Sequence, residues 1–448
     1  MLLSRFARVD APRKNMTDSQ QASHARDVFS TSPGSEVEIH GWVVRKNSVG
    51  GIVFVVIRDG SGYVQVSAKN SIADEDAMKA IKAVSRESLV TVHGTVREDR
   101  RAPGGREISA KSFKVLSQAD TWPITKTASK SASFLYDIRH LSIRSRKVVA
   151  TMKIRAEVIG AAFDFFRSGG FTLISAPSFV QAAVEGGSTL FSVDYFGKSV
   201  NLSQSAQFYE EAALPALEKV WIFQPAFRAE RSRTSKHLTE FWMIEAEQAF
   251  ADQTENMRLQ EELLSFITKR VLGDRQTELK ILGRTLREFQ LPLPRITYDE
   301  VQSTSSKEGV PFHWGDDIPT EAERAISMKH DTPFFITDYP LSARSFYHQT
   351  YEGRPNVTKS ADLIAPEGFG ELATGGQRIA EHEVLLDRIK GQDLPSESFG
   401  WYLELRKYGM PVHSGFGIGV ERTTRWLGGL KHIRAASLFP RTLSRVSP

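Results

Sequence analysis

The chain has no cysteine, which excludes disulfide bonds and thiolate metal sites and is compatible with a reducing compartment. No apolar run approaches the roughly 20 residues that a membrane-spanning helix requires, so we expect a soluble protein with no membrane partner. The phosphate-binding fingerprints GxGxxG and GxxxxGK(S/T) are also missing, so any use of ATP would not involve a P-loop. What remains is an ordinary folded composition, 40% hydrophobic and 25% charged.

The 448 residues allow two or three domains, and the net charge of +5 permits an anionic partner without establishing one. Residues 1–35 are polar and low in pattern, which predicts a disordered or targeting-like extension. The start bears arginine and faintly resembles an organelle transit peptide, but such peptides are poor in acids, and Asp10 and Asp18 are present. We therefore expect a cytoplasmic protein, with organellar targeting as the alternative.

Residues 36–120 show mostly alternating apolar and polar positions, as strands with one buried face do. A helical stretch at 73–84 interrupts this strand pattern. The predicted strands lie at 37–44, 52–57, 63–66, 89–96 and 108–115. Strands, one intervening helix and more strands in so short a region are typical of an OB-type barrel.

Residues 121–140 predict a polar hinge linker ahead of a second domain over 141–448. A long amphipathic helix is expected over 147–168, stopped by two glycines. Its expected apolar stripe comprises Val149, Met152, Ala156, Ile159, Phe163 and Phe166. The remainder mixes strands and helices without regular β-α-β alternation, so the sequence favours an α+β fold over a doubly wound parallel sheet.

The segment 227–241 contains the most informative side chains. Arg228, at the end of one strand, and Phe241, at the start of the next, can face one site across a hairpin. The arginine would bind a phosphate or carboxylate in bidentate fashion, and the aromatic ring would stack on a purine. Glu230 could accept a hydrogen bond from the exocyclic amine of that purine. On spacing alone, an ordinary hairpin with surface charge is equally compatible.

The second informative segment is 415–422, in which glycines occupy alternate positions. Gly417 and Gly419 would let the backbone pass close to a bound nucleotide. Arg422 would then lie at the start of a helix, where it could meet the distal phosphate. A glycine-rich strand by itself is a weak indication, which gains weight only beside the first segment.

Together these segments resemble motifs 2 and 3 of the class II aminoacyl-tRNA synthetases, and 171–177 resembles motif 1. The preceding barrel resembles that of the aspartyl, asparaginyl and lysyl subgroup, and the spelling of 204–207 is similar to its archaeal type. The resemblance implies an N-terminal OB-fold, an antiparallel catalytic sheet flanked by helices, and a homodimer formed through motif 1. It covers about 36–448.

The resemblance also implies roles for residues that match the motifs. Arg228 would bridge the amino-acid carboxylate and the α-phosphate of ATP, and Arg422 would hold the γ-phosphate. Phe241 and Glu230 would bind adenine, and His237 would help bind pyrophosphate oxygens. The implied nucleotide site further includes Glu371, Gly417 and Gly419. Asp362 and Glu371 would be Mg²⁺ ligands, although two acids at this spacing are elsewhere usually surface charge.

Residues 202–212 bear on the amino acid that is activated. The resemblance puts Glu210 where aspartyl enzymes carry a lysine, and a glutamate there would repel aspartate. Glu211 matches the acid that accepts from the substrate amide in asparaginyl enzymes, and Arg378 would donate to the amide oxygen. Glu185 and Gln207 would hold the α-ammonium group. The alternative for Glu210 and Glu211 is a pair on a helix surface.

In the barrel, Arg45, Phe54 and Gln65 match positions that bind the anticodon in this subgroup. An aromatic ring can stack on a base, and an amide can recognise its Watson–Crick edge. The alternative places Phe54 in the barrel core.

The resulting hypothesis is a ligase that activates L-asparagine with ATP and Mg²⁺ and loads tRNA(Asn). The first alternative is an aspartyl-tRNA synthetase, possibly one that accepts both tRNAs. The second is a paralogue that adenylates asparagine or aspartate for an acceptor other than tRNA, and the third is a non-catalytic RNA-binding relative.

Overall fold

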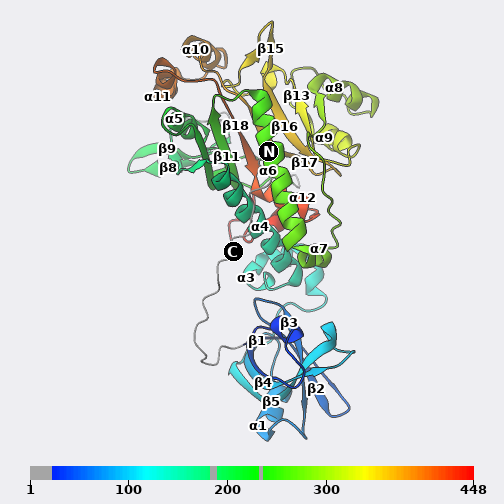
Figure 1. The fold of residues 1–448 in the computed structure, drawn as a ribbon. Helices are drawn as coiled ribbons and strands as arrows, with labels where there is room; N and C mark the ends of the chain where they lie inside the picture. Colours follow the sequence, from blue (N-terminus) through cyan, green and yellow to red (C-terminus); the bar gives the residue numbers. More distant parts are fainter. Residues whose placement is uncertain (1–22, 182–188, 232–235) are drawn as a thin grey trace. The chain divides into compact units, whose positions relative to one another are not determined.

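The computed structural model describes residues 23–181, 189–231 and 236–448. The chain divides into two compact units, 1–134 and 135–448. Among the described residues, no helix has the length and apolar character needed to cross a membrane. Figure 1 shows both units as ribbons.

The first unit is a closed barrel in which the strands follow the order β1-β2-β3-β5-β4. Over the first eight residues of β1 and of β4 every second position is buried, because successive residues of a strand point to opposite faces. The interior is filled almost entirely by aliphatic side chains. The elements are β1 (Glu36–Val49), β2 (Ile52–Arg58), β3 (Tyr63–Lys69), α1 (Glu75–Ala83), β4 (Leu89–Glu98) and β5 (Arg106–Ser117).

The segment before the first strand packs on the barrel from residue 23 onward. Ala25 and Val28 are buried in the barrel core, and the Ala25 amide donates to Asp59 Oδ2 at 2.8 Å. The extension predicted over 1–35 therefore included residues that belong to the barrel unit. Its last part contributes Ala25 and, from a short 3-10 turn, η1 (Asp27–Phe29), Val28. This segment is too short to produce a periodic pattern.

The second unit is built on a mixed eight-stranded sheet in the order β12-β13-β16-β17-β18-β11-β10-β6. Its central strands are antiparallel, and parallel pairs occur only at its two ends. The strands are β6 (Thr172–Leu173), β10 (Lys219–Phe227), β11 (Glu240–Ala249), β12 (Arg295–Thr297), β13 (Phe334–Thr337), β16 (Ser360–Ala365), β17 (Gly370–Gln377) and β18 (His413–Gly419). This is the predicted α+β class.

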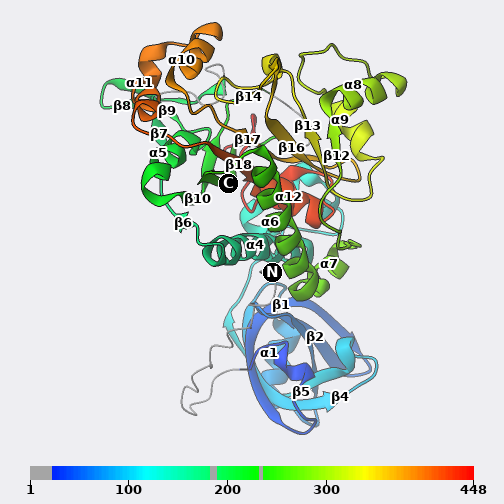
Figure 2. The ribbon, with the colours of Figure 1, turned by 45° about the horizontal axis from the view of Figure 1, so that its top comes forward.

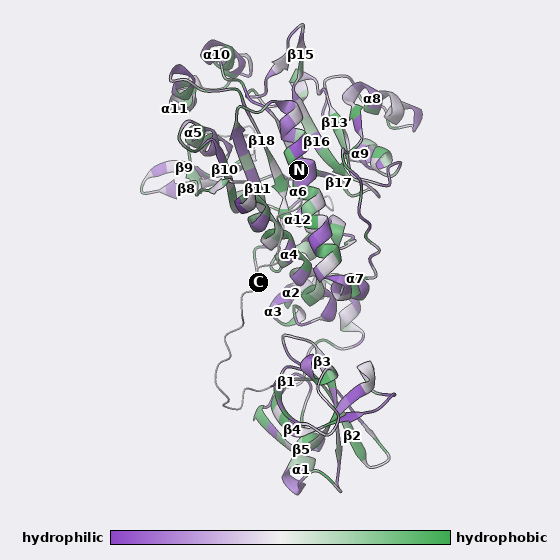
Figure 3. Ribbon diagram, viewed as in Figure 1, coloured by the Kyte–Doolittle hydropathy of each residue, from purple (hydrophilic) through white to green (hydrophobic). Residues whose placement is uncertain are grey.

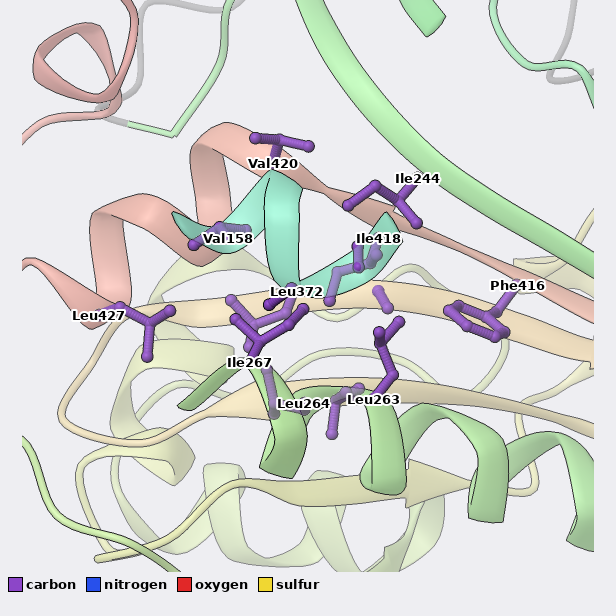
Figure 4. Close-up of a cluster of buried hydrophobic side chains, with 14 of the residues drawn as sticks. Val158, Ile244, Leu263, Leu264, Ile267, Leu372, Phe416, Ile418, Val420 and Leu427 are labelled. Carbon is purple, nitrogen blue, oxygen red and sulfur yellow. The ribbon is translucent and has the colours of Figure 1, made fainter. Parts of the chain in front are cut away.

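Helices α4 (Arg146–Ser168), α6 (Gln253–Asp274) and α12 (Val420–Leu427) pack together over this sheet, as Figures 1 and 2 show. Their apolar side chains meet those of β17 and β18 in the main core, drawn in Figure 4. Along α6 hydrophilic and hydrophobic residues alternate in Figure 3, as expected for a helix with one buried face.

The buried face of α4 differs from the predicted stripe. Val149 is 36% exposed, whereas Ile154 and Val158 are fully buried. Of the predicted stripe only Phe166 is fully buried, and Ile159 and Phe163 pack at the edge of the core. The helix carries apolar residues on more than one side, so the sequence pattern did not determine which side faces the sheet.

Smaller elements surround the ends of the sheet. Helices α10 and α11 lie near α5, and α8 and α9 lie on the other side of the sheet, in both ribbon views. The remaining α-helices and strands are α2 (Ala132–Asp137), α3 (Arg139–Ser142), β7 (Phe179–Val180), β8 (Ser192–Tyr195), β9 (Lys198–Leu202), α5 (Gln207–Leu217), α7 (Gln276–Leu282), α8 (Tyr298–Lys307), α9 (Thr320–Ser327), β14 (Thr350–Tyr351), β15 (Arg354–Thr358), α10 (His382–Gly391) and α11 (Gly400–Glu404).

Candidate active site

A cavity of about 330 Å³ is lined by residues of β11, β17, β18 and the start of α5. Its wall is strongly charged, with both acids and arginines. Ten of the predicted site residues line this one cavity: Gln207, Arg228, Glu230, His237, Phe241, Glu371, Arg378, Gly417, Gly419 and Arg422.

The predicted hairpin brings Arg228 and Phe241 together. Strand β10 pairs with β11 so that Ala226 lies opposite Phe241, and the Arg228 amide donates to the Thr239 carbonyl at 3.0 Å. The Arg228 guanidinium lies 5.4 Å from the centre of the Phe241 ring, within the range of a cation–π contact. A planar cation and an aromatic face therefore stand side by side in the cavity wall.

Glu230 and His237 lie at the same part of the cavity, 3.6 Å apart between carboxylate Oε2 and imidazole Nε2. Burial, together with the nearby charge of Arg422, lowers the pKa of His237. The imidazole thus stays neutral to a lower pH than an exposed histidine, and it can donate one hydrogen bond without adding a second positive charge.

Arg422, in the first turn of α12, forms an ion pair with Glu371 at 2.6 Å. Burial alone would raise the pKa of Glu371, but the charges of Arg422 and Lys236 lower it to about 2. Glu371 is therefore anionic throughout the physiological range.

The glycines of β18 have a packing role that the sequence did not indicate. A Cβ at Gly417 would lie 2.7 Å from the Met243 methyl group, and one at Gly415 would lie 2.0 Å from Glu247 Cδ. The space above this strand is thus occupied by side chains of β11. Gly417 and Gly419 still line the cavity.

The two predicted metal ligands lie on adjacent strands. The Thr374 hydroxyl is 2.7 Å from Asp362 Oδ1 and 3.4 Å from Glu371 Oε1. Oxygen donors of this kind fit Mg²⁺. However, Asp362 is paired with Arg344 at 2.7 Å, and only Glu371 lines the cavity. Within 23–181, 189–231 and 236–448, no group of three or more His, Asp or Glu has the geometry to hold a metal.

Glu211 was predicted to accept a hydrogen bond from the substrate amide, but it does not line the cavity. Its carboxylate is fully buried and accepts hydrogen bonds from the Tyr402 hydroxyl at 2.8 Å and from His413 Nε2 at 3.0 Å, and it also pairs with Arg406. Burial would raise the pKa of Glu211, but Arg406 and His413 hold it well below its usual range. Adjacent helix residues point about 100° apart, and the structure turns Glu210 to the cavity instead.

Arg378 lies in the cavity wall and is held by Glu247, with 2.6 Å between Nη2 and Oε1 and 3.0 Å between Nε and Oε1. Gln207 Nε2 donates to Glu211 Oε1 at 3.0 Å. Glu185, the other predicted ligand of the α-ammonium group, lies outside the described residues.

Several residues of the site were missed. Glu245 accepts from the Ala206 amide at 3.2 Å, and Glu247 holds Arg378. Two acids at alternate positions directly after the apolar run 241–244 were a visible signal for both. Arg406 and Tyr402, which hold Glu211, lie almost 200 residues further along the chain, and no local pattern connects them.

The predicted anticodon residues share one face of the barrel. Arg45 and Gln65 both pair with Val56, two residues from Phe54 on the same outward side of β2. Phe54 is half-buried and does not belong to the barrel core, so that alternative is wrong. Gln65 Nε2 donates to Glu107 Oε2 at 2.8 Å, which fixes the orientation of its amide.

Comparison with known families agrees with this architecture. The family described as tRNA synthetases class II (D, K and N) matches residues 131–443, and the OB-fold nucleic acid binding domain matches residues 37–116. The chain belongs to the class II tRNA synthetases of this D, K and N group. The family predicted from the motifs, the α+β class and the OB-fold are thereby confirmed.

The similar proteins point to one member of that group. The asparagine–tRNA ligase of Thermoplasma acidophilum is 44% identical over 418 residues, 93% of this chain and 97% of that protein. A crystal structure of asparaginyl-tRNA synthetase from Pyrococcus horikoshii, complexed with asparaginyl-adenylate, is 40% identical with a TM-score of 0.92, covering 96% of this chain and all (100%) of that one. The corresponding complex from Entamoeba histolytica is 28% identical with a TM-score of 0.87, covering 95% and 99%.

Proposed function

We propose that the chain is an asparagine–tRNA ligase, which activates L-asparagine with ATP to asparaginyl-adenylate and transfers asparagine to the 3′ end of tRNA(Asn). One observation carries this proposal. A single cavity contains an arginine–aromatic pair suited to a nucleotide and, further along its wall, an arginine–glutamate cluster suited to a small polar amino acid. The relatives complexed with asparaginyl-adenylate support it.

On the nucleotide side, Phe241 stacks on adenine and Glu230 accepts from its exocyclic amine. Arg228 bridges the α-phosphate and the substrate carboxylate, and Arg422 binds the γ-phosphate. His237, held neutral by burial, donates a hydrogen bond to pyrophosphate oxygens. Gly417 and Gly419 contribute backbone rather than side chains to the same wall.

Glu371 would hold Mg²⁺ at the cavity, with Asp362 behind it as the second carboxylate. The shared hydrogen-bond distance to Thr374 supports this pairing. When bound, the ion supplies positive charge that neutralises the phosphates.

The first step requires positioning rather than a protein nucleophile. The α-carboxylate of asparagine attacks the α-phosphorus of ATP, and the bond to the β-phosphate oxygen breaks as pyrophosphate leaves. Arg228 keeps both reacting groups adjacent and donates to oxygens on which negative charge accumulates. In the second step a ribose hydroxyl at the tRNA 3′ end attacks the activated carbonyl, and AMP leaves.

On the amino-acid side, Arg378 donates to the amide oxygen of asparagine, and Gln207, with Glu185, binds the α-ammonium group. The buried Glu247–Arg378 pair supports this role because it fixes the direction of the guanidinium.

The barrel binds the anticodon through Arg45, Phe54 and Gln65, whose common outward face supports a single base-binding surface. The protein acts as a homodimer through motif 1, where Leu173 is 49% exposed; Phe179, just after the motif, is 48% exposed. The reaction is assigned to the cytoplasm.

ATP–pyrophosphate exchange with asparagine and, separately, with aspartate tests the proposal. Exchange that depends on asparagine is expected. A preference for aspartate would replace the proposal with an aspartyl enzyme. Exchange with asparagine but no charging of total tRNA would point to a different acceptor.

A further inference from the structure

Glu210 is a buried acid in the wall of the cavity, 1% exposed. Its Oε1 has no hydrogen-bond partner among the described residues. By contrast, Glu247 is paired with Arg378, and Glu211 with Arg406 and His413. A buried acceptor without a partner has lost its hydration without gaining a hydrogen bond in return. A ligand in the cavity that donates a hydrogen bond would compensate for this loss.

The charges around Glu210 disfavour a second anion. Glu245 and Glu247 face it from β11 and Glu211 from its own helix, with Arg378 as the opposing charge. Burial, with these acids, raises the pKa of Glu210 well above its usual range, so these surroundings disfavour its anion. Arg378 offsets this only in part, because it is already paired with Glu247. An N–H donor bound at the carboxylate would favour the anion again.

Arg378 can nevertheless serve a ligand. A guanidinium has five N–H donors. In the described structure, Nε and Nη2 donate to Glu247, and Nη1 lies 3.3 Å from His348 Nε2. One N–H on each of Nη1 and Nη2 remains for the cavity. The wall thus offers a donor at Arg378 and an acceptor at Glu210.

A carboxamide matches this pair in both directions. Its oxygen accepts from Arg378, and its NH₂ group donates to Glu210. A carboxylate of the same size offers two acceptors and a negative charge, so it would leave Glu210 without a donor and face several acids. Like charges brought together without solvent between them repel strongly.

We propose that Glu210 discriminates asparagine from aspartate in this site by accepting the side-chain N–H of asparagine and repelling the carboxylate of aspartate. Glu211 is a positioning residue, which holds Arg406, Tyr402 and His413 beneath the cavity. This inference rests on the proposed function, and it identifies Glu210 as the group that accepts a hydrogen bond from the side-chain amide of asparagine.

The test compares kcat and KM for asparagine and aspartate in ATP–pyrophosphate exchange. The variant is Glu210→Gln, which keeps the shape of the side chain and removes its charge. We expect the ratio of kcat/KM for asparagine to that for aspartate to fall at least about tenfold, chiefly because activity with aspartate rises. The KM for ATP should stay unchanged.

Glu211→Gln and Tyr402→Phe serve as matched controls. Both alter the network under the cavity, so they are expected to lower thermal stability while the asparagine-to-aspartate ratio is kept. Tyr402→Phe removes one hydroxyl only and provides the control if Glu211→Gln does not fold. A ratio unchanged by Glu210→Gln, or reduced more by the controls, would overturn the inference. Wild-type enzyme inactive with asparagine would instead overturn the proposed function.

The pH dependence of the ratio gives a second measurement. Protonation removes the charge of Glu210, so discrimination is present above its pKa and is lost as the pH falls through it. Because that pKa is raised, the loss should begin at a higher pH than for an exposed glutamate of pKa about 4.3. Glu210→Gln should abolish this dependence, and a wild-type ratio independent of pH would contradict it.

Discussion

The two units handle charge in opposite ways. The barrel buries aliphatic side chains, and its described buried acids are Glu87 and Glu107. The catalytic unit buries a network of acids and arginines around one cavity, including Glu211, Arg406 and Arg378. In the barrel, folding and recognition are therefore carried by opposite faces of the same strands. In the catalytic unit they depend on the same side chains, so a substitution there is expected to change both.

The largest effect is expected where a buried charge loses its partner. Arg406→Met would leave Glu211 without its guanidinium, at a cost of about 3–5 kcal/mol in the free energy of unfolding. Denaturant unfolding measures this. The double variant with Glu211→Gln should recover part of the loss. A single variant as stable as the wild type would contradict the account of this network.

A comparable effect on rate, without unfolding, is expected at Arg228. Arg228→Ala should lower kcat in ATP–pyrophosphate exchange by about 10²–10³-fold, because it removes donors to the transferred phosphoryl group. The exposed Arg287→Ala is a control for a general loss of positive charge. Equal loss in both variants would refute a specific role for Arg228.

In the barrel, the two faces should separate recognition from stability. Phe54→Ala should weaken tRNA binding by about 1–3 kcal/mol, seen as a raised KM for tRNA, while exchange without tRNA is unchanged. Ile57→Ala, on the buried side of the same strand, should cost about 2–5 kcal/mol of barrel stability. If Phe54→Ala destabilised the barrel and left the KM for tRNA unchanged, the proposed division between faces would fail.

The smallest effect is expected for the free energy of unfolding of the Glu210→Gln variant. Replacing a buried carboxyl group whose Oε1 has no partner should leave the free energy of unfolding unchanged or raise it by about 0.5–2 kcal/mol, because active-site groups are often retained at a cost in stability. Glu211→Gln should lower it. Denaturant unfolding of the two variants at neutral pH compares them directly, and a clear destabilisation by Glu210→Gln would indicate that its carboxylate has a structural partner.

Sequence alternation was enough to predict the barrel strands, since one face is buried along each of them. The extent of α4 was also predictable from its amphipathic pattern and the two glycines that follow it, but its buried side was not. The choice between Glu210 and Glu211 needed the structure as well. It depends on Tyr402, Arg406 and His413, which reach Glu211 from distant parts of the chain.

The most direct test of the proposed function is aminoacylation of two tRNA transcripts that differ only in carrying an asparagine or an aspartate anticodon. Each is incubated with ATP, Mg²⁺ and radiolabelled asparagine or aspartate. The account predicts that asparagine is loaded, and preferentially onto the transcript with the asparagine anticodon. Loading of aspartate in preference to asparagine, or exchange with asparagine but no loading of either transcript, would contradict it.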